Sequence, residues 1–184
     1  METFLKPHSA SVLSNTLAGA DFDTKVAMAL KAAHVMKTGW CEWCQRWCTI
    51  PSVFLHVAGT PCTDDSPQGT RAGNEYGVTF LPTFVWVCQR LLLRDRVVCH
   101  ENVPEFCLRF FRATLGSIYI VISIIIDCFD LGWPKRRERR ITLFLLREAL
   151  MDTVSNFEPF VRSCFRTCEL AWFDFFVLTD EDFS

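Results

Sequence analysis

The pattern of hydrophobic and polar positions changes from segment to segment along the chain. Some segments have the spacing of an amphipathic helix, and others have that of a buried strand. Val26, Leu30 and Ala33 recur at helical spacing, which predicts a helix over residues 21–37. A short apolar run over residues 52–58 precedes a glycine and is typical of a buried strand. The same spacings predict further helices over 81–93, 104–115 and 147–178, and further strands over 96–100, 119–126 and 141–146.

This alternation predicts an α/β fold with a mostly parallel sheet and flanking helices, because parallel neighbours need a crossover between them. No repeat and no linker divides the chain, which favours one domain. Residues 59–77 contain four glycines and two prolines and are predicted to form a long polar loop. Loops of this length in compact domains are often functional.

Composition narrows the class of protein. Half of the 184 residues are hydrophobic and 22% are charged, so a core can form and a disordered tail is excluded. A net charge of -2 excludes a uniformly basic surface. The 17 Phe and 6 Trp predict an aromatic core. The first residues do not resemble a secretory signal, and the longest apolar run, 115–126, is shorter than the about 20 residues of a membrane helix. We therefore expect an intracellular protein without a membrane span.

The chain has ten cysteines, and three of them lie close together in sequence: Cys41, Cys44 and Cys48. One C-x-x-C pair without a second pair at zinc-finger spacing is a weak metal signal. We expect ordinary free thiols and no metal site. The residues that could complete a site in space are His34, His56, Cys164 and Cys168.

Catalytic and ligand-binding residues of α/β proteins often lie on the loops at the carboxyl ends of strands. Three segments at the ends or turns of predicted strands hold the most reactive and most charged residues of their neighbourhood. Residues 58–69 read AGTPCTDDSPQG, residues 100–106 read HENVPEF and residues 131–143 read LGWPKRRERRITL. Residues 135–140 have five basic side chains and one acidic, a local charge of +4 that suits phosphate contact.

In this order, the three segments resemble the catalytic motifs of the cytosine-5 DNA methyltransferase family. The first resembles the family's Pro-Cys nucleophile loop, G-x-P-C-x-x-F-S-x-x-G. The second is similar to its Glu-Asn-Val motif, and the third to its G-x-P-Q-x-R-x-R motif. Cys62 and Glu101 are 39 positions apart, which fits the strand–loop–helix–strand segment between the first two motifs. The family's Phe is replaced by Asp65 and its Gln by Lys135.

The resemblance implies a role for each matching residue. Cys62 would add to carbon 6 of cytosine, a covalent step that makes carbon 5 nucleophilic. Glu101 would hydrogen-bond ring nitrogen 3 and the exocyclic amine, and Arg139 the ring oxygen, with Arg137 in a supporting role. The base would first be flipped out of the duplex. The further positions that the resemblance places around the substrate are Pro61, Ser66, Asn102 and Val103.

The resemblance also implies a fold and a cofactor. The fold is a Rossmann-like sheet of the S-adenosylmethionine-dependent type, from which the first strand and its glycine loop are missing here. Asp21 resembles the acidic residue that holds the ribose of S-adenosylmethionine. Residues 1–147 would then be a partial catalytic domain, and residues 148–184 a helical segment with an acidic tail.

Three hypotheses follow. The first is a truncated or divergent methyltransferase that acts on cytosine in DNA, with RNA as a possible substrate and the nucleus as its expected location. The second is an inactive remnant that binds nucleic acid or a protein, with an exposed sheet edge that favours association. The third is a thiol hydrolase that pairs Cys62 with His100 as base. The sequence leaves the oligomeric state open.

Overall fold

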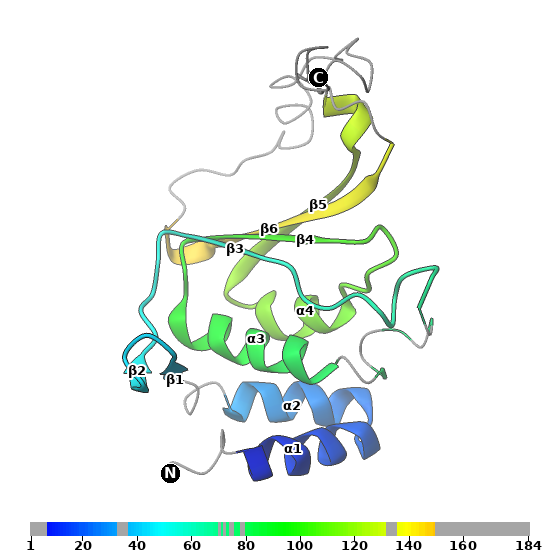
Figure 1. The fold of residues 1–184 in the computed structure, drawn as a ribbon. Helices are drawn as coiled ribbons and strands as arrows, with labels where there is room; N and C mark the ends of the chain where they lie inside the picture. The colour runs from blue at the N-terminus through cyan, green and yellow to red at the C-terminus, as the bar shows by residue number, and fades with distance from the viewer. Residues whose placement is uncertain are drawn as a thin grey trace, which may run out of the picture.

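The computed structural model describes residues 7–32, 37–69, 71, 73, 76–77, 80–131 and 136–149 (Figure 1). They form a mixed α/β fold with a four-stranded sheet, a separate two-stranded hairpin and flanking helices. The helix predicted over 147–178 and the acidic tail lie outside the described residues, except for a short 3-10 turn at Arg147–Ala149. No helix in the described part is long and apolar enough to cross a membrane.

The main sheet has the order β3 (Leu55–Ala58), β4 (Val97–Asn102), β6 (Glu138–Leu146) and β5 (Tyr119–Asp127). Of its three pairings only β3 with β4 is parallel, and β6 runs antiparallel to both neighbours. The prediction of a mostly parallel sheet is therefore wrong. Residues 128–137 connect β5 to β6, and a connection this short makes a hairpin, whereas a parallel crossover needs a dozen or more residues.

Four helices lie on one side of the main sheet (Figure 1): α1 (Pro7–Gly19), α2 (Phe22–Ala32), α3 (Phe80–Leu93) and α4 (Arg109–Leu115). The predicted helices over 21–37 and 81–93 correspond to α2 and α3, while α1 was not predicted. α4 begins five residues later than predicted, because a turn precedes it in which the Phe106 N–H donates to the carbonyl of Val103.

The core between helices and sheet is aromatic, as the composition predicts. Six of its aromatic rings belong to fully buried side chains, namely Phe84, Phe106, Phe110, Phe111, Tyr119 and Phe144. Trp86 of α3 joins them, with its ring centroid 5.1 Å from that of Phe111 and 6.0 Å from that of Phe144. Edge-to-face and tilted contacts of this kind add about 0.5–1.5 kcal/mol per pair beyond simple burial.

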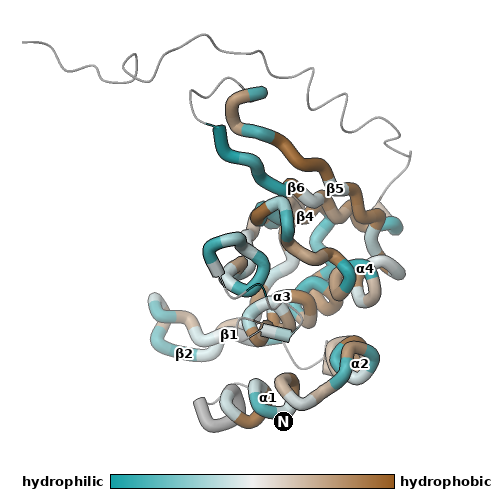
Figure 2. The backbone as a smooth tube through the Cα atoms, turned by 90° about the vertical axis from the view of Figure 1, so that its right-hand side faces the viewer, coloured by the Kyte–Doolittle hydropathy of each residue, from teal (hydrophilic) through white to brown (hydrophobic). Residues whose placement is uncertain are grey.

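The second face of the sheet is also largely apolar, and β5, which is brown over most of its length in Figure 2, contributes isoleucines to it. Strand alternation and register place one set of side chains on this face: Leu55, Val57, Val97, Cys99, Ile120, Ile122, Ile124, Ile141, Leu143 and Leu145. None of the four described helices covers it (Figure 1). At its β3 end, Leu55 is 54% and Val57 67% exposed.

Candidate active site

The carboxyl ends of β3 and β4 lie side by side, since Ala58 pairs with His100 in the parallel register. Gly59, the first residue after β3, therefore lies against Glu101. A Cβ atom at Gly59 would stand 3.2 Å from the carbonyl oxygen of Glu101 and 3.6 Å from its Oε2, a close approach that glycine permits. The loop that carries Cys62 thus begins directly beside the carboxylate of Glu101.

Glu101 and Arg139 form an ion pair at this edge, with 2.7 Å between Arg139 Nε and Glu101 Oε1. Glu101 is the register partner of Ile141 on β6, so Arg139, two residues earlier on that strand, is its diagonal neighbour on the same face. The two side chains are 47% and 23% exposed. A pair this exposed contributes only about 0–1 kcal/mol, so a polar ligand can displace one partner at little cost.

Asn102 fastens the start of the Cys62 loop to β4. Its Nδ2 donates to the carbonyl oxygen of Thr60 at 2.9 Å, and its Oδ1 accepts the Val103 N–H at 2.9 Å. Asn102 is 3% exposed and Thr60 9%. Both polar atoms of the Asn102 side-chain amide therefore bind backbone, one at Thr60 and one at Val103, and Thr60 is held two residues before Cys62.

His100 holds the same residue from the other side. Its Nε2 accepts the Thr60 N–H at 3.3 Å and lies 3.0 Å from Thr60 Oγ1. The ring is 1% exposed among Phe106, Phe111 and other aromatic side chains, and this burial lowers the pKa of His100 to about 4. At neutral pH the ring is uncharged, with its accepting nitrogen turned to Thr60 and not to Cys62. The hydrolase hypothesis therefore loses its base.

The Cys62 loop itself is a compact turn. The carbonyl oxygen of Cys62 accepts the N–H groups of Asp65 at 3.0 Å and Ser66 at 2.9 Å. A Cβ atom at Gly69 would stand 1.5 Å from the loop's own backbone, so this position requires glycine. Pro61 is exposed, Cys62 and Ser66 are half-buried, and Asp65, which replaces the motif's Phe, is buried.

Arg140 is a positioning residue that the sequence did not single out. Its Nε donates to the carbonyl oxygen of Pro104 at 2.9 Å, and its Nη1 donates to Ser123 Oγ at 3.3 Å. β6 begins at Glu138, three residues earlier than predicted, so Arg139 and Arg140 occupy successive strand positions and point to opposite faces. Arg139 therefore forms the ion pair with Glu101, and Arg140 donates to the backbone of Pro104.

Arg137 lies in the turn before β6 and is exposed. Its backbone N–H donates to Asp127 Oδ1 at 2.8 Å, and its carbonyl accepts the Cys128 N–H at 3.2 Å. Backbone N–H groups of Phe129 and Arg137 lower the pKa of Asp127. The contacts of Arg137 thus belong to the hairpin turn, and the structure does not bring it to Glu101.

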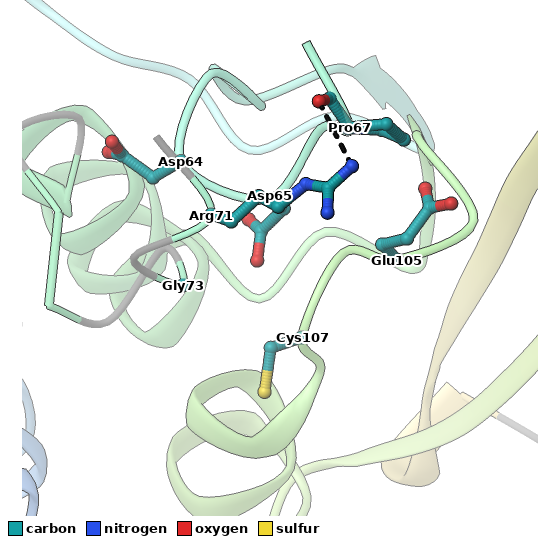
Figure 3. A pocket seen from close by; sticks show the side chains of 7 residues that line it. All are labelled: Asp64, Asp65, Pro67, Arg71, Gly73, Glu105 and Cys107. Carbon is teal, nitrogen blue, oxygen red and sulfur yellow. Dashed lines mark hydrogen bonds between the residues drawn. The ribbon is translucent and has the colours of Figure 1, made fainter. Parts of the chain in front are cut away.

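A cavity of about 540 Å³ lies beside the Cys62 loop (Figure 3). The residues that line it are Asp64, Asp65, Pro67, Arg71, Gly73, Glu105 and Cys107. Arg71 Nη2 donates to the carbonyl of Pro67 at 3.3 Å across its rim. Three acidic side chains against one arginine make this lining unsuited to phosphate, and it does not include Cys62, Glu101 or Arg139. Glu101 and Arg139 lie where β4 pairs with β6, and the loop that carries Cys62 begins beside Glu101.

Asp21 follows a helix instead of a strand. Its Oδ1 accepts the Thr24 N–H at 2.7 Å, so it caps the N-terminus of α2, and this hydrogen bond lowers its pKa. The carboxylate expected to hold a ribose is thus engaged in helix capping. Among the described residues no glycine-rich turn stands beside it, so they do not assemble a site for S-adenosylmethionine.

No protein-family model matches this chain, and no curated protein matches it. Among solved structures, the chain is similar to an E. coli protein named as a DNA modification methyltransferase encoded within a prophage, with 18% sequence identity and a TM-score of 0.42. The similarity covers 54% of this chain and 28% of that chain. At that score it supports no argument about function, which is argued below from the site itself.

Proposed function

We propose that this chain carries the base-binding half of a cytosine-5 methyltransferase active site and adds Cys62 to a cytosine in DNA. The observation that supports it is the Glu101–Arg139 pair, which stands at the strand ends from which the Cys62 loop departs. A cysteine, a glutamate and an arginine are the groups that the proposed addition to the pyrimidine uses. The mixed sheet would then be the later part of a Rossmann-like methyltransferase sheet.

The chemistry assigned to the residues is an addition and its reversal. The Cys62 thiolate forms a bond to carbon 6, and the electron pair of the 5,6 double bond moves to carbon 5. Glu101, with Arg139 on the ring oxygen, holds the pyrimidine during this shift. Carbon 5 takes a proton from water, which leaves hydroxide. The hydroxide then removes the original hydrogen of carbon 5 as a proton, and the electron pair left on carbon 5 re-forms the double bond as the thiolate leaves. The net result is hydrogen exchange at carbon 5.

S-adenosylmethionine, when bound, would supply the methyl group that carbon 5 takes in place of a proton. The described residues do not fit this cofactor, because the carboxylate of Asp21 is used to cap α2. The proposal therefore concerns base addition by the described residues, and methyl transfer is tested separately. An inactive remnant that binds DNA without addition is the competing hypothesis, and the same experiment separates the two.

The test is tritium release from a DNA duplex that carries cytosine labelled with tritium at carbon 5. The purified full chain is incubated with the duplex without cofactor, and tritium in the solvent is counted. We expect release from wild type, none from Cys62→Ser, and at least about tenfold less from Glu101→Gln, since the carboxylate binds the ring in the addition step. Glu148→Gln, which changes an exposed glutamate in the Arg94 ion pair, should release tritium at the wild-type rate.

A second arm uses a duplex with 5-fluorocytosine, in which the adduct persists after methyl transfer because fluorine cannot leave as a cation. A shifted band on a denaturing gel that depends on S-adenosylmethionine and on Cys62 would establish methyl transfer. Tritium release without such a band would restrict the function to base addition. Folded protein that binds the duplex but releases no tritium would refute the proposal and establish the remnant.

A further inference from the structure

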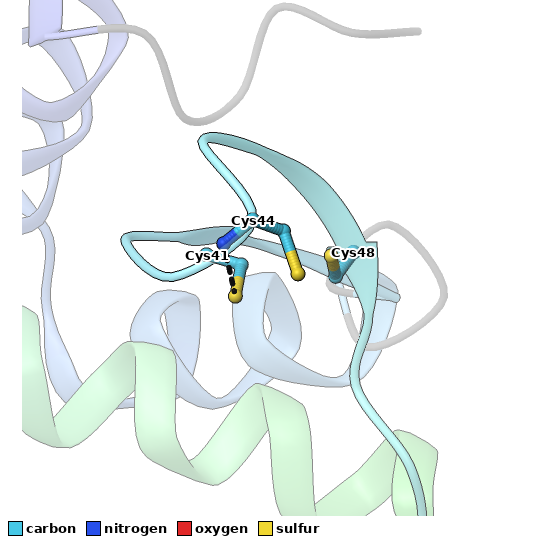
Figure 4. A group of neighbouring side chains, drawn as sticks. All are labelled: Cys41, Cys44 and Cys48. Atoms are coloured by element: carbon cyan, nitrogen blue, oxygen red, sulfur yellow. Dashed lines mark hydrogen bonds between the residues drawn. The ribbon is translucent and has the colours of Figure 1, made fainter.

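The hairpin of β1 (Thr38–Cys41) and β2 (Arg46–Thr49) is a separate two-stranded sheet that the proposed function does not use. The turn between its strands carries Cys44, and the strands carry Cys41 and Cys48 (Figure 4). The three Sγ atoms all lie within 4.8 Å of one another. The sequence had predicted ordinary thiols here, because spacing alone could not show that Cys48 returns to the C-x-x-C pair.

The turn has the shape of a metal-binding knuckle. The backbone N–H of Cys44 donates to Cys41 Sγ at 3.4 Å, which points a dipole at the sulfur and favours the thiolate. Gln45 has a positive φ of 49°, so the chain reverses directly after Cys44 and starts β2. In the register Gly39 pairs with Cys48, which brings the third sulfur back beside the turn.

Among the described residues, the hairpin has few other sources of stability besides its backbone pairing and the edge-to-face contact of Trp40 with Trp47, whose ring centroids are 6.0 Å apart. Isolated two-stranded hairpins are marginal in water, and each strand here has only four residues. No residue from 37 to 50 is buried or belongs to the hydrophobic core. Three tryptophans are exposed on it, Trp40, Trp43 and Trp47, with Trp43 at 95%. A cross-link would stabilise such a hairpin, and the three sulfurs lie close enough together to form one around a metal ion.

We propose that Cys41, Cys44 and Cys48 bind a zinc ion through three thiolates, with the fourth tetrahedral position open to another donor. Zinc–sulfur bonds of about 2.3 Å in a tetrahedron place the sulfurs about 3.8 Å apart, so small side-chain rotations suffice. Thiolates select soft or borderline metal ions, and zinc needs no redox partner. Binding releases one proton from each thiol, and Arg46, which contacts Cys44, partly offsets the negative charge that results.

The test is metal analysis of the full chain, purified without chelator, with Cys48→Ser as the disrupting variant. Cys128→Ser is the matched control, because Cys128 is also half-buried but stands outside the cluster. We expect one zinc per chain in wild type and in the control. In Cys48→Ser the affinity should fall by at least about tenfold. Cobalt substitution should give thiolate-to-cobalt absorption in wild type that Cys48→Ser loses.

Two further readouts keep the test decisive if Cys48→Ser does not fold. Cys48→His retains a zinc ligand, so it should still bind cobalt, with a spectrum shifted toward fewer thiolates. Removal of zinc from wild type should change the tryptophan fluorescence, since three tryptophans lie on the hairpin. Wild type that binds no cobalt, that binds it equally well as Cys48→Ser, or that forms a Cys41–Cys44 disulfide in place of binding metal would overturn the proposal.

Discussion

At the scale of single residues, His100 links the core to the candidate site. Burial lowers its pKa, so the ring is neutral, and its Nε2 accepts the Thr60 N–H at the start of the Cys62 loop. Protonation of that nitrogen would remove the acceptor and place a charge among aromatic rings. The same residue therefore determines both the stability of the fold and the attachment of the loop at low pH.

The resulting prediction concerns stability against pH. The pKa of His100 is about 4 in the folded chain, against about 6.5 when unfolded, so the unfolded chain binds more protons between these values. The contribution is fully present above pH 6.5 and is lost as the pH falls toward 4, by about 3 kcal/mol in all. Urea unfolding of wild type and His100→Gln across this range should show a flatter dependence for the variant, whose amide can still accept from Thr60.

His56→Gln is the matched control, because His56 lies on the same sheet face and accepts a hydrogen bond from Trp86 at 3.2 Å. Burial also lowers the pKa of His56, but that side chain is only partly buried, so its substitution should flatten the curve less. Equal slopes for wild type and His100→Gln would contradict the assignment of this pH dependence to His100.

At the scale of elements, the site depends on how strand ends are fastened to one another. The strands that flank the site could be predicted from apolar runs, and the adjacency of the Cys62 loop and Glu101 followed from the parallel pairing of β3 with β4. The antiparallel course of β6 was missed, because the basic residues Arg139 and Arg140 interrupt the apolar signal and obscured where the strand starts. Pairing partners of this kind depend on tertiary contacts that a local pattern does not contain.

Substitution of Asn102 tests whether its hydrogen bonds hold the Cys62 loop at the strand ends. Asn102→Ala removes the hydrogen bond to the carbonyl of Thr60 and leaves buried backbone groups unpaired, which should lower the free energy of unfolding by about 1–3 kcal/mol. The loop should also open more often, so trypsin should cleave after the exposed Arg71 faster than in wild type. Thr142→Val removes a hydrogen bond from an equally buried side chain to Ser123, within the sheet. That control should be less stable than wild type but should not be cleaved faster. Equal cleavage rates in both variants would contradict the prediction that Asn102 holds the loop.

At the scale of the whole molecule, the described helices cover only one face of the main sheet, and the other face carries mainly apolar side chains. β3 is an edge strand of the described sheet. Its side chains Leu55 and Val57 are exposed, and Phe54, just before the strand, is 69% exposed. An uncharged edge strand with apolar side chains is a template for pairing with another chain. We therefore expect the isolated chain to self-associate through β3 in a concentration-dependent way.

Sedimentation velocity over a range of concentrations measures this association. Val57→Lys introduces a charge on the edge strand, where it opposes strand pairing, and should shift the equilibrium toward monomer. Val12→Lys makes the same change at a residue that is 55% exposed on α1, away from the sheet, and should leave the association unchanged. A wild-type chain that stays monomeric at every concentration would contradict the prediction. Equal effects of both lysines would mean that net charge, and not β3, controls the association.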